Sequence, residues 1–446
     1  MRCGAMKQRA IFRFERFSPR QLKILTWWCA ESPVHDHDGI IADGAIRSGK
    51  TLSMSLSFVL WAMSTFNMQN FGMCGKTIGS FRRNVLVALK LMLRARGFRV
   101  EDRRGDNLLV VRRKDAENYF YVFGGKDERS QDLIQGVTLA GVFFDEVALM
   151  PQSFVNQATG RCSVDGSKFW FNCNPEGPDH WFYTEWILKH KEKRILYLHF
   201  TMEDNPSLTD RIKERYRAMY DGVFYDRFIR GLWVIAEGLI YRQFAQSPEH
   251  WLVDGLSDAQ KANLRFISIG VDFGGTRSLT TFVATAVIGN FDEIVVYKDA
   301  HIPGVKGEID AERVATEFIR FCRTIEAELP NAHIKYAFMD SEAQYLINSV
   351  RKAARAAGLG VQIGDSAKHE IMQRIVCTLT LLNMNRMHIL HRCTLLIGGL
   401  KSASWDETKK KDVRLDNFSS DIDILDGFEY SFERFMKKLV PEGRQE

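Results

Sequence analysis

One eight-residue segment limits the possible folds of this chain more than any other: Gly44-Ala-Ile-Arg-Ser-Gly-Lys-Thr51. It matches the pattern G-x-x-x-x-G-K-[ST] in full, follows an apolar strand predicted at Gly39–Ala42, and precedes a helix predicted at Leu52–Phe66. In this context the glycines let backbone N–H groups surround phosphate oxygens, and the helix N-terminus adds partial positive charge. The segment therefore predicts an α/β domain that binds a nucleotide.

Different side chains of this loop should bind different parts of Mg²⁺-ATP. Lys50 should reach the β- and γ-phosphates, and the Thr51 hydroxyl should ligate Mg²⁺. Arg47 could stabilise the γ-phosphate or could point outward to solvent or DNA, and the sequence leaves both open. The residues that we assign to nucleotide binding in the loop are Gly44, Arg47, Ser48, Gly49, Lys50 and Thr51.

A second apolar strand, predicted at Gly141–Phe144, ends in two adjacent carboxylates. It should carry Asp145 to the sheet edge beside the phosphate loop, where Asp145 can join the Mg²⁺ shell. Glu146 is then placed to polarise the water that attacks the γ-phosphate. A strand that merely ends in an acidic turn is the structural alternative, but the upstream loop favours an ATPase.

Two further polar residues are candidates for the nucleotide site. Asn174 follows the strand predicted at Phe169–Asn172 and could sense the γ-phosphate and couple hydrolysis to movement; an ordinary Asn-Pro turn is the alternative. Gln21 lies upstream, where many motor ATPases hold the adenine with a glutamine, and a plain helix cap is the alternative there.

The second half of the chain predicts another α/β unit. A Gly289-Asn290 pair marks a hairpin turn between two of its strands. Three strands in a meander, followed by alternating helices and strands, is the order of an RNase H-like domain. We place the junction within Gly231–Leu256, which gives domains at 1–240, with a short linker to about 258, and at 259–446. The predicted elements are strands at Phe266–Asp272, Thr280–Val287, Glu293–Lys298 and Ile334–Met339, and helices at Glu308–Leu329, Glu342–Ala357 and onward to the C-terminus.

Four aspartates in this second unit are candidates for a metal site. Asp272 and Asp340 each stand at the end of a strand, so both reach one sheet edge if the strands are parallel neighbours. Asp423 and Asp426 share a helix face by their spacing. Gathered carboxylates repel one another, and two divalent ions about 4 Å apart would compensate them and activate water for attack on a phosphodiester. Each aspartate alone could be a surface or capping residue, but their order favours a nuclease.

Composition excludes several other classes of protein. The chain has 446 residues, a net charge of +6 and eight cysteines without a C-x-x-C pair, which predicts reduced thiols in a cytosolic protein and neither a disulfide framework nor a zinc site. The longest apolar stretch, Leu52–Met63, is too short to span a bilayer. We expect a soluble, intracellular protein without membrane contact.

Together these motifs resemble the large terminase subunits of tailed bacteriophages, nearest to the branch that cuts headful-packaged genomes. The resemblance covers nearly the whole chain. Further segments that stand where that family has similar ones are Gly124-Gly125, Gln135-Gly136, Asp204-Asn205-Pro206, and Gly231-Leu-Trp followed by Glu237-Gly238.

The resemblance implies a P-loop ATPase of the ASCE type followed by an RNase H-like nuclease. It implies a motor that translocates double-stranded DNA into a procapsid through the portal protein and cuts concatemers with Mg²⁺ or Mn²⁺. The implied setting is the host cytoplasm, with the small terminase subunit as a partner and a homo-oligomeric ring on the portal. Asp272 and Asp340 correspond to the first two metal ligands and Asp426 to the last. Asp423 stands where members often carry histidine, which leaves the third ligand open between Asp423 and Asp426.

Two rival functions fit parts of the sequence. A repair or recombination ATPase fused to a structure-specific nuclease would be expected to carry extended helicase motifs or a second RecA-like half, and neither is found. The second rival is a scaffold that is switched by ATP, carries a degenerate nuclease, and binds portal or DNA without cutting. The retained Lys50, Glu146, Asp272 and Asp340 together weigh against it. An ATPase assay discriminates the scaffold from the enzyme.

Overall fold

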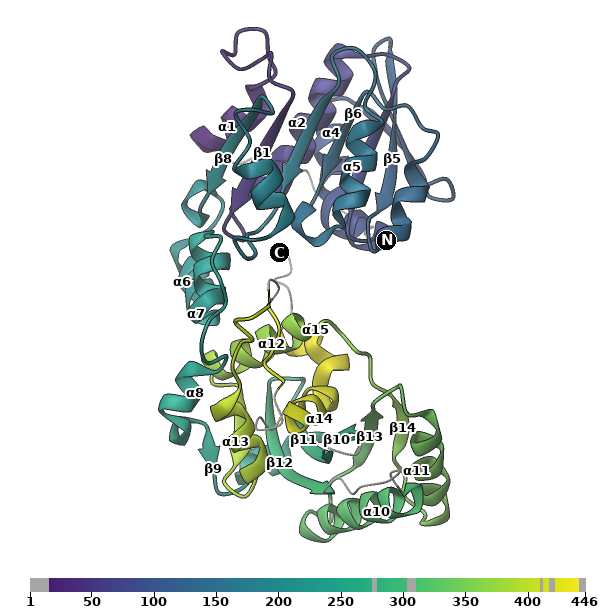
Figure 1. Ribbon diagram of the computed structural model, residues 1–446, viewed down its shortest axis with the longest axis vertical. Helices are drawn as coiled ribbons and strands as arrows, with labels where there is room; N and C mark the ends of the chain where they lie inside the picture. The colour runs from purple at the N-terminus through teal and green to yellow at the C-terminus, as the bar shows by residue number, and fades with distance from the viewer. Residues whose placement is uncertain (1–15, 275–278, 303–309, 410–411, 417–421, 441–446) are drawn as a thin grey trace, which may run out of the picture. The chain divides into compact units, whose positions relative to one another are not determined.

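The computed structural model describes residues 16–274, 279–302, 310–409, 412–416 and 422–440. The chain forms two compact units (Figure 1). Unit 1 comprises Met1–Tyr216 and Val223–Ile235, and unit 2 comprises Arg217–Gly222 and Ala236–Glu446. Within the described ranges, no helix is long and apolar enough to cross a bilayer.

Unit 1 is built on an eight-stranded sheet in the order β3-β4-β5-β2-β6-β7-β1-β8. In sheet order, the six strands β5-β2-β6-β7-β1-β8 pair in parallel. Strands β3 and β4 extend the sheet beyond β5 with antiparallel pairs. The strands predicted at Gly39–Ala42, Gly141–Phe144 and Phe169–Asn172 are found as β1, β6 and β7. The sequence also predicts a strand at Tyr119–Phe123, which is found as β5, and the other four strands were not predicted. The bounds are β1 Gly39–Gly44, β2 Asn70–Gly75, β3 Arg99–Arg103, β4 Leu108–Arg113, β5 Ala116–Gly124, β6 Gly141–Phe144, β7 Lys168–Asn172 and β8 Ile195–Phe200.

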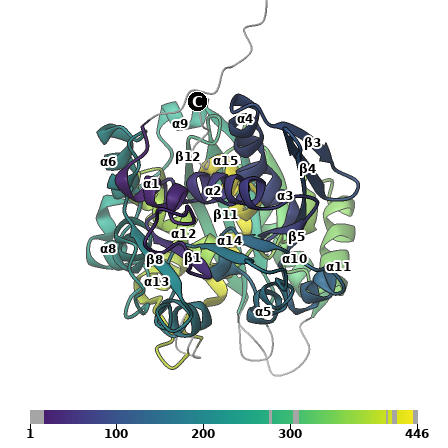
Figure 2. The ribbon, with the colours of Figure 1, turned by 90° about the horizontal axis from the view of Figure 1, so that it is seen from above.

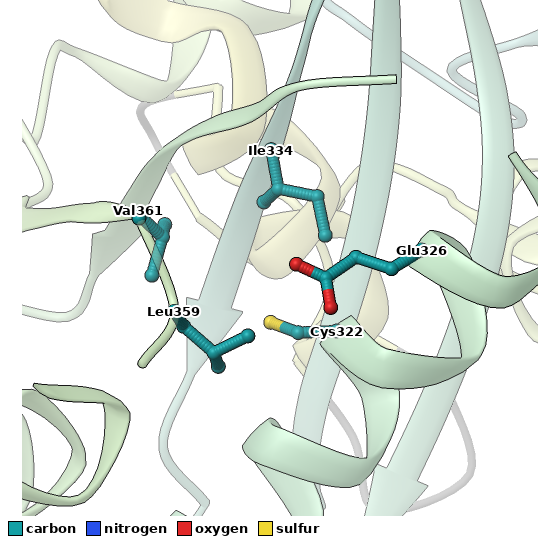
Figure 3. A pocket seen from close by; sticks show the side chains of 6 residues that line it. Cys322, Glu326, Ile334, Leu359 and Val361 are labelled. Carbon is teal, nitrogen blue, oxygen red and sulfur yellow. The ribbon is translucent and has the colours of Figure 1, made fainter. Parts of the chain in front are cut away.

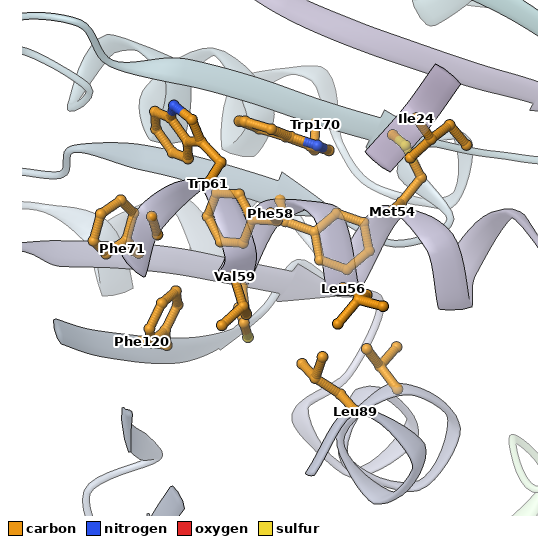
Figure 4. Close-up of a cluster of buried hydrophobic side chains, with 14 of the residues drawn as sticks. Ile24, Met54, Leu56, Phe58, Val59, Trp61, Phe71, Leu89, Phe120 and Trp170 are labelled. Atoms are coloured by element: carbon orange, nitrogen blue, oxygen red, sulfur yellow. The ribbon is translucent and has the colours of Figure 1, made fainter. Parts of the chain in front are cut away.

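Helices cover both faces of this sheet. Figure 2 shows α2 (Lys50–Thr65) and α4 (Val87–Ala95) on one side of the strands and α5 (Gln152–Gly160) on the other. α2 is buried almost all round, because its large residues such as Phe58 and Trp61 fill the core against the sheet (Figure 4). Its serines are satisfied inside this core: the Ser57 hydroxyl accepts a hydrogen bond from the Trp170 indole at 3.2 Å and donates to the carbonyl of Ile24 at 2.6 Å.

Unit 2 is built on a seven-stranded sheet in the order β14-β13-β10-β11-β12-β15-β9. Strands β10, β11 and β12 form the predicted antiparallel meander, and β13 lies parallel to β10. The predicted helix at Glu308–Leu329 is found as α10, Ala311–Glu328, and Glu308 itself lies outside the described residues. Helices alone were expected after Ala357, but β14 and β15 lie there. The bounds are β9 Leu252–Val253, β10 Leu264–Asp272, β11 Thr280–Ile288, β12 Glu293–Ile302, β13 Ile334–Met339, β14 Gln362–Asp365 and β15 Met387–Leu390.

Helix α14 (Ile422–Phe432) packs closely across β10 and β11. The contact depends on two glycines: a Cβ atom on Gly270 would lie 1.9 Å from the carbonyl oxygen of Gly427. On the opposite face of β11, Phe282 meets Phe318 of α10 with ring centroids 6.3 Å apart. The glycine contact brings the start of α14 next to the end of β10. The predicted α/β fold class, with a P-loop unit followed by an RNase H-like unit, is confirmed.

Candidate functional site

The phosphate loop of unit 1 leaves the end of β1 and enters α2 directly at Lys50. Gly44 and Gly49 have φ angles of 120° and 82°, which L side chains rarely adopt. A Cβ atom on Gly44 would also lie 2.0 Å from the carbonyl oxygen of Phe200 on β8. Both glycines are therefore needed for the loop to curl beside the sheet.

The Lys50 ammonium group is buried inside the loop. Its Nζ donates to the carbonyl oxygens of Gly44 (2.9 Å) and Ala45 (2.6 Å), to the Ser48 hydroxyl (3.2 Å) and to Oδ1 of Asn174 (3.2 Å). Burial lowers the pKa of Lys50 to about 8, against the opposing effect of nearby acidic groups. The structure thus places Lys50 and Asn174, two residues predicted separately from the sequence, in contact.

The ends of β6 and β7 hold a hydrogen-bonded group of polar side chains. Oδ1 of Asp145 accepts from the Thr51 hydroxyl and from the Asn172 amide, both at 2.9 Å. Burial raises the pKa of Asp145, and these hydrogen bonds oppose the rise. Oδ1 of Asn172 accepts a hydrogen bond from the backbone N–H of Glu146 at 2.9 Å. The φ angle of Glu146 is 60°, which is strained for a residue other than glycine.

Asn172 was not predicted, although a signal for it existed. It is the last residue of an apolar strand that runs parallel to β6, with Phe144 paired to Phe171, so its side chain had to end level with Asp145. The sequence analysis selected Asn174 instead, as the polar residue that follows this strand. The two asparagines have different contacts: Asn172 binds the Asp145 carboxylate and the backbone of Glu146, and Asn174 accepts from Lys50.

The two ambiguous residues lie against the loop. Gln21 forms a capping box with Ser18 at the start of α1 (Pro19–Thr26). Its side-chain amide also packs against Gly49 of the loop: a Cβ atom on Gly49 would lie 2.3 Å from Nε2 of Gln21. The guanidinium of Arg47 lies over the Tyr216 ring at 5.5 Å.

A buried acidic group that the sequence did not indicate lies on β1, next to the loop. Asp43 is fully buried, accepts from the Trp233 indole at 2.8 Å, and is 3.1 Å from Nδ1 of His199 on β8. The hydrogen bond to Asp43 raises the pKa of His199. The same carboxylate therefore joins β1, the neighbouring edge strand β8 and Trp233.

In unit 2 the strand register brings two of the predicted aspartates together. β10 and β13 are parallel neighbours with Val271 paired to Met339, and the N–H of Asp340 donates to the carbonyl of Val271 at 3.0 Å. The condition on which the sequence argument depended, parallel neighbouring strands, is met, and this pairing sets Asp272 beside Asp340. The pKa of Asp272 is raised well above its usual range, first by burial and then by the nearby charges of Asp426, Asp340 and Asp423.

Basic side chains that the sequence did not reveal offset part of this negative charge. Oδ1 of Asp426 lies 2.9 Å from Arg374 and 2.7 Å from Arg414, and both arginines also contact the buried Glu429 at 2.8 Å. The Nζ atom of Lys368 lies 2.7 Å from Oδ1 of Asp340. These partners are far apart in sequence and carry no motif, so only the fold identifies them.

Asp423, unlike Asp426, is hydrogen-bonded to backbone and hydroxyl groups. Its carboxylate accepts the backbone N–H of Leu279, and its carbonyl accepts the Thr281 hydroxyl at 2.9 Å. As the side chains stand, the described ranges contain no group of three histidine, cysteine or carboxylate side chains arranged to hold a metal ion.

A small hollow between α10 and the segment before β14 is separate from this acidic site (Figure 3). Cys322 and Glu326 of α10 point into it, opposite Leu359. Its wall includes Ile334, which begins β13, whereas Asp340 follows the other end of that strand. The hollow therefore is not part of the carboxylate cluster.

Comparisons with known proteins identify the family. Residues 41–247 match the family described as "Terminase large subunit, T4likevirus-type, N-terminal". The chain is similar to a crystal structure of the large terminase from a thermophilic bacteriophage, with 44% identity and a TM-score of 0.83, covering 95% of this chain and 100% of that one. Structures of the same phage protein with ADP (44% identity, TM-score 0.79) and with ATP-γ-S (43%, 0.79) each cover 94% of this chain, and 98% and 100% of theirs. No curated protein sequence matched.

Identity at this level over nearly the full length of both chains establishes the relationship. The predicted resemblance to large terminase subunits is confirmed, and so is the predicted enzyme class. The chain belongs to the large terminase family, and it is an ATPase and a nuclease.

Proposed function

We propose that this large terminase is the motor subunit of a viral DNA-packaging machine. It hydrolyses ATP in the domain at 1–240 to move double-stranded DNA into a procapsid, and it cuts concatemeric DNA in the domain at 259–446. The observation that carries the proposal is the presence of both constellations in one chain: Lys50, Thr51 and Asp145 in unit 1, and the aspartates around Asp272 in unit 2. The similar phage terminase structures with ADP and ATP-γ-S support ATP as the nucleotide.

In the ATPase, the residues of unit 1 take distinct roles. The curled loop and the N-terminus of α2 surround the phosphates, and Lys50 exchanges its carbonyl partners for β- and γ-phosphate oxygens. Thr51 and Asp145, already hydrogen-bonded to each other, would hold Mg²⁺. Glu146 orients and deprotonates the attacking water, and Asn174 reports the state of the γ-phosphate through Lys50.

In the nuclease, Asp272, Asp340 and Asp426 would hold divalent metal ions, with Asp423 as a further candidate. The donor set consists of carboxylate oxygens, which suits Mg²⁺ or Mn²⁺, and the raised pKa of the buried Asp272 fits a centre whose local negative charge is under-compensated. Bound metal supplies Lewis acidity for phosphodiester hydrolysis. The protein orients the carboxylates through β10, β13 and α14, and Arg374 and Arg414 fix Oδ1 of Asp426.

The packaging role implies partners and a place of action. We propose that the enzyme works in the host cytoplasm with the small terminase subunit and forms a ring when it docks on the portal protein. We also propose headful cutting. Stimulation of ATP turnover by purified portal protein tests the docking.

Plasmid cleavage tests the central proposal. Purified wild-type protein should cut plasmid DNA in Mg²⁺ or Mn²⁺, and Asp272→Ala should lower the rate by about 10²-fold or more, as expected when a key charge-stabilising group is removed. Wild-type ATP turnover in the same preparation controls for folding of unit 1. Equal cutting by wild type and Asp272→Ala would refute the assignment of the nuclease centre.

A further inference from the structure

One lysine contacts the carboxylate cluster of unit 2 from its solvent side. The Nζ atom of Lys368 lies 2.7 Å from both Oδ1 of Asp340 and Oε1 of Glu342, and its side chain is 35% exposed. Its positive charge also acts on the buried Asp272, whose pKa it lowers against the effect of the surrounding carboxylates. Lys368 is therefore close to the reacting centre and still accessible to a large substrate.

The backbone around Lys368 is held in place by a buried carboxylate. Glu433, whose side chain is fully buried, accepts the N–H groups of three consecutive residues: Ala367, Lys368 at 3.2 Å and His369 at 3.1 Å. Lys368 itself adopts a left-handed conformation with φ of 45°, which a lysine rarely takes without such support. Glu433 directly follows α14, so the element that carries Asp426 also fixes the lysine.

The segment is also tied to the strand that carries Asp340. The N–H of Ser366 donates to the carbonyl of Met339, the last residue of β13, at 2.6 Å. The segment around Lys368 thus has two anchors, Glu433 directly after α14 and Met339 at the end of β13, and each lies in or next to an element that positions an aspartate of the cluster. Such doubly supported strain is typical of functional positions.

The two arginines of the cluster, Arg374 and Arg414, are too buried to contact DNA directly. Their side chains are only 9% and 1% exposed and are bound to Asp426 and Glu429. A DNA phosphate could reach them only by breaking buried ion pairs, which is costly. The pair of Lys368 with Asp340 is partly solvated, so exchanging its partner costs little.

We propose that Lys368 contacts the phosphodiester that this centre cleaves, its ammonium moving from Asp340 to a non-bridging phosphate oxygen. The inference deepens the proposed nuclease function and rests on it. Movement of the lysine would free Oδ1 of Asp340 for metal at the same time as it adds positive charge beside the phosphate, where charge develops during the reaction.

The test compares Lys368→Ala and Lys368→Arg with a matched control, Lys261→Ala, which removes an exposed lysine from α9 (Asp258–Ala262) in the same unit. Cleavage is measured at saturating plasmid over a Mn²⁺ titration. We expect Lys368→Ala to lower the rate by about 10²-fold at saturating Mn²⁺, Lys368→Arg to retain the rate within about tenfold, and Lys261→Ala to match wild type.

A binding measurement that does not depend on turnover completes the test. In the Asp272→Ala background with Mn²⁺, the affinity for a short duplex is measured by anisotropy against salt. Loss of one phosphate contact should reduce the salt slope by about 0.9. Full recovery of Lys368→Ala at high Mn²⁺, or an unchanged slope, would show that Lys368 only holds Asp340 and would overturn the inference. If Asp272→Ala still cuts, the nuclease centre itself is wrong and the inference falls with it.

Discussion

At the scale of single residues, Asn172 makes the most decisive contacts of the ATPase site. One amide binds Asp145 and the backbone of Glu146, so it fixes both the carboxylate that would face Mg²⁺ and the one that would face water. Its hydrogen bonds also oppose the rise in the pKa of Asp145 that burial causes. A buried carboxylate without this donor would be more easily protonated.

We therefore expect Asn172→Ala to lower kcat for ATP hydrolysis by about 10- to 100-fold, the usual cost of losing a group that orients a ligand. The KM for ATP should change less, because Lys50 and the loop remain. Steady-state ATPase assays measure both constants. Asn156→Ala, at an exposed position of α5, is the control. A kcat within about twofold of wild type would mean that Glu146 keeps its position without Asn172.

His199 gives a prediction for pH. Its hydrogen bond to Asp43 raises its folded pKa above the unfolded value of about 6.5. The contact therefore stabilises the protein in full below that unfolded value, and the contribution is lost as pH rises through the folded pKa. The difference in Tm between wild type and His199→Gln should be larger at about pH 6 than at about pH 9. A difference that does not change with pH would contradict an ionised pair.

At the scale of elements, the contact between β10 and α14 decides where the third aspartate lies. Gly270 has no room for a side chain, since a Cβ atom would meet the Gly427 carbonyl oxygen at 1.9 Å and the Ser431 nitrogen at 2.5 Å. Both are backbone atoms, so the whole helix would have to move. Asp423 and Asp426 would move with it.

Gly270→Ala should therefore lower both stability and cutting. Overpacking of this kind costs about 1–3 kcal/mol, and the shift of α14 should reduce plasmid cleavage further than the loss of folded protein explains. Thermal melting and cleavage per folded molecule measure the two effects. Gly360→Ala is the matched control, since no atom lies within 4 Å of its Cβ position. Wild-type cleavage by folded Gly270→Ala would show that the helix position is not critical.

The sequence predicted those elements and site residues whose signal is local. The loop at residues 44–51, the carboxylates after β6 and the meander of unit 2 each follow from a short pattern. β8 was missed although its residues, Ile195–Phe200, are mostly apolar, and β14 was missed because it is a short edge strand with partly exposed residues. Lys368, Arg374 and Arg414 were missed because they approach the aspartates only through the fold. Whether Asp423 or Asp426 binds metal stays a prediction.

At the scale of the whole molecule, the two constellations lie in different compact units. Each unit has its own sheet. Among the described residues, the hydrogen-bond partners of Lys50 belong to unit 1, and the charged groups that shift the pKa of Asp272 belong to unit 2. A substitution in one site should therefore leave the local geometry of the other intact. The two chemistries should be separable.

Lys50→Ala should lower the rate of ATP turnover by about 10²-fold or more, because no other described side chain takes its place inside the loop. The same variant should retain metal-dependent plasmid cutting. Asp272→Ala should show the reverse pattern. Both activities are measured on the same preparation of each variant, with thermal melting as the check on folding. If each folded variant lost both activities, ATP turnover and cutting would be one coupled process, and the division of the chain into an ATPase and a nuclease that act independently would have to be abandoned.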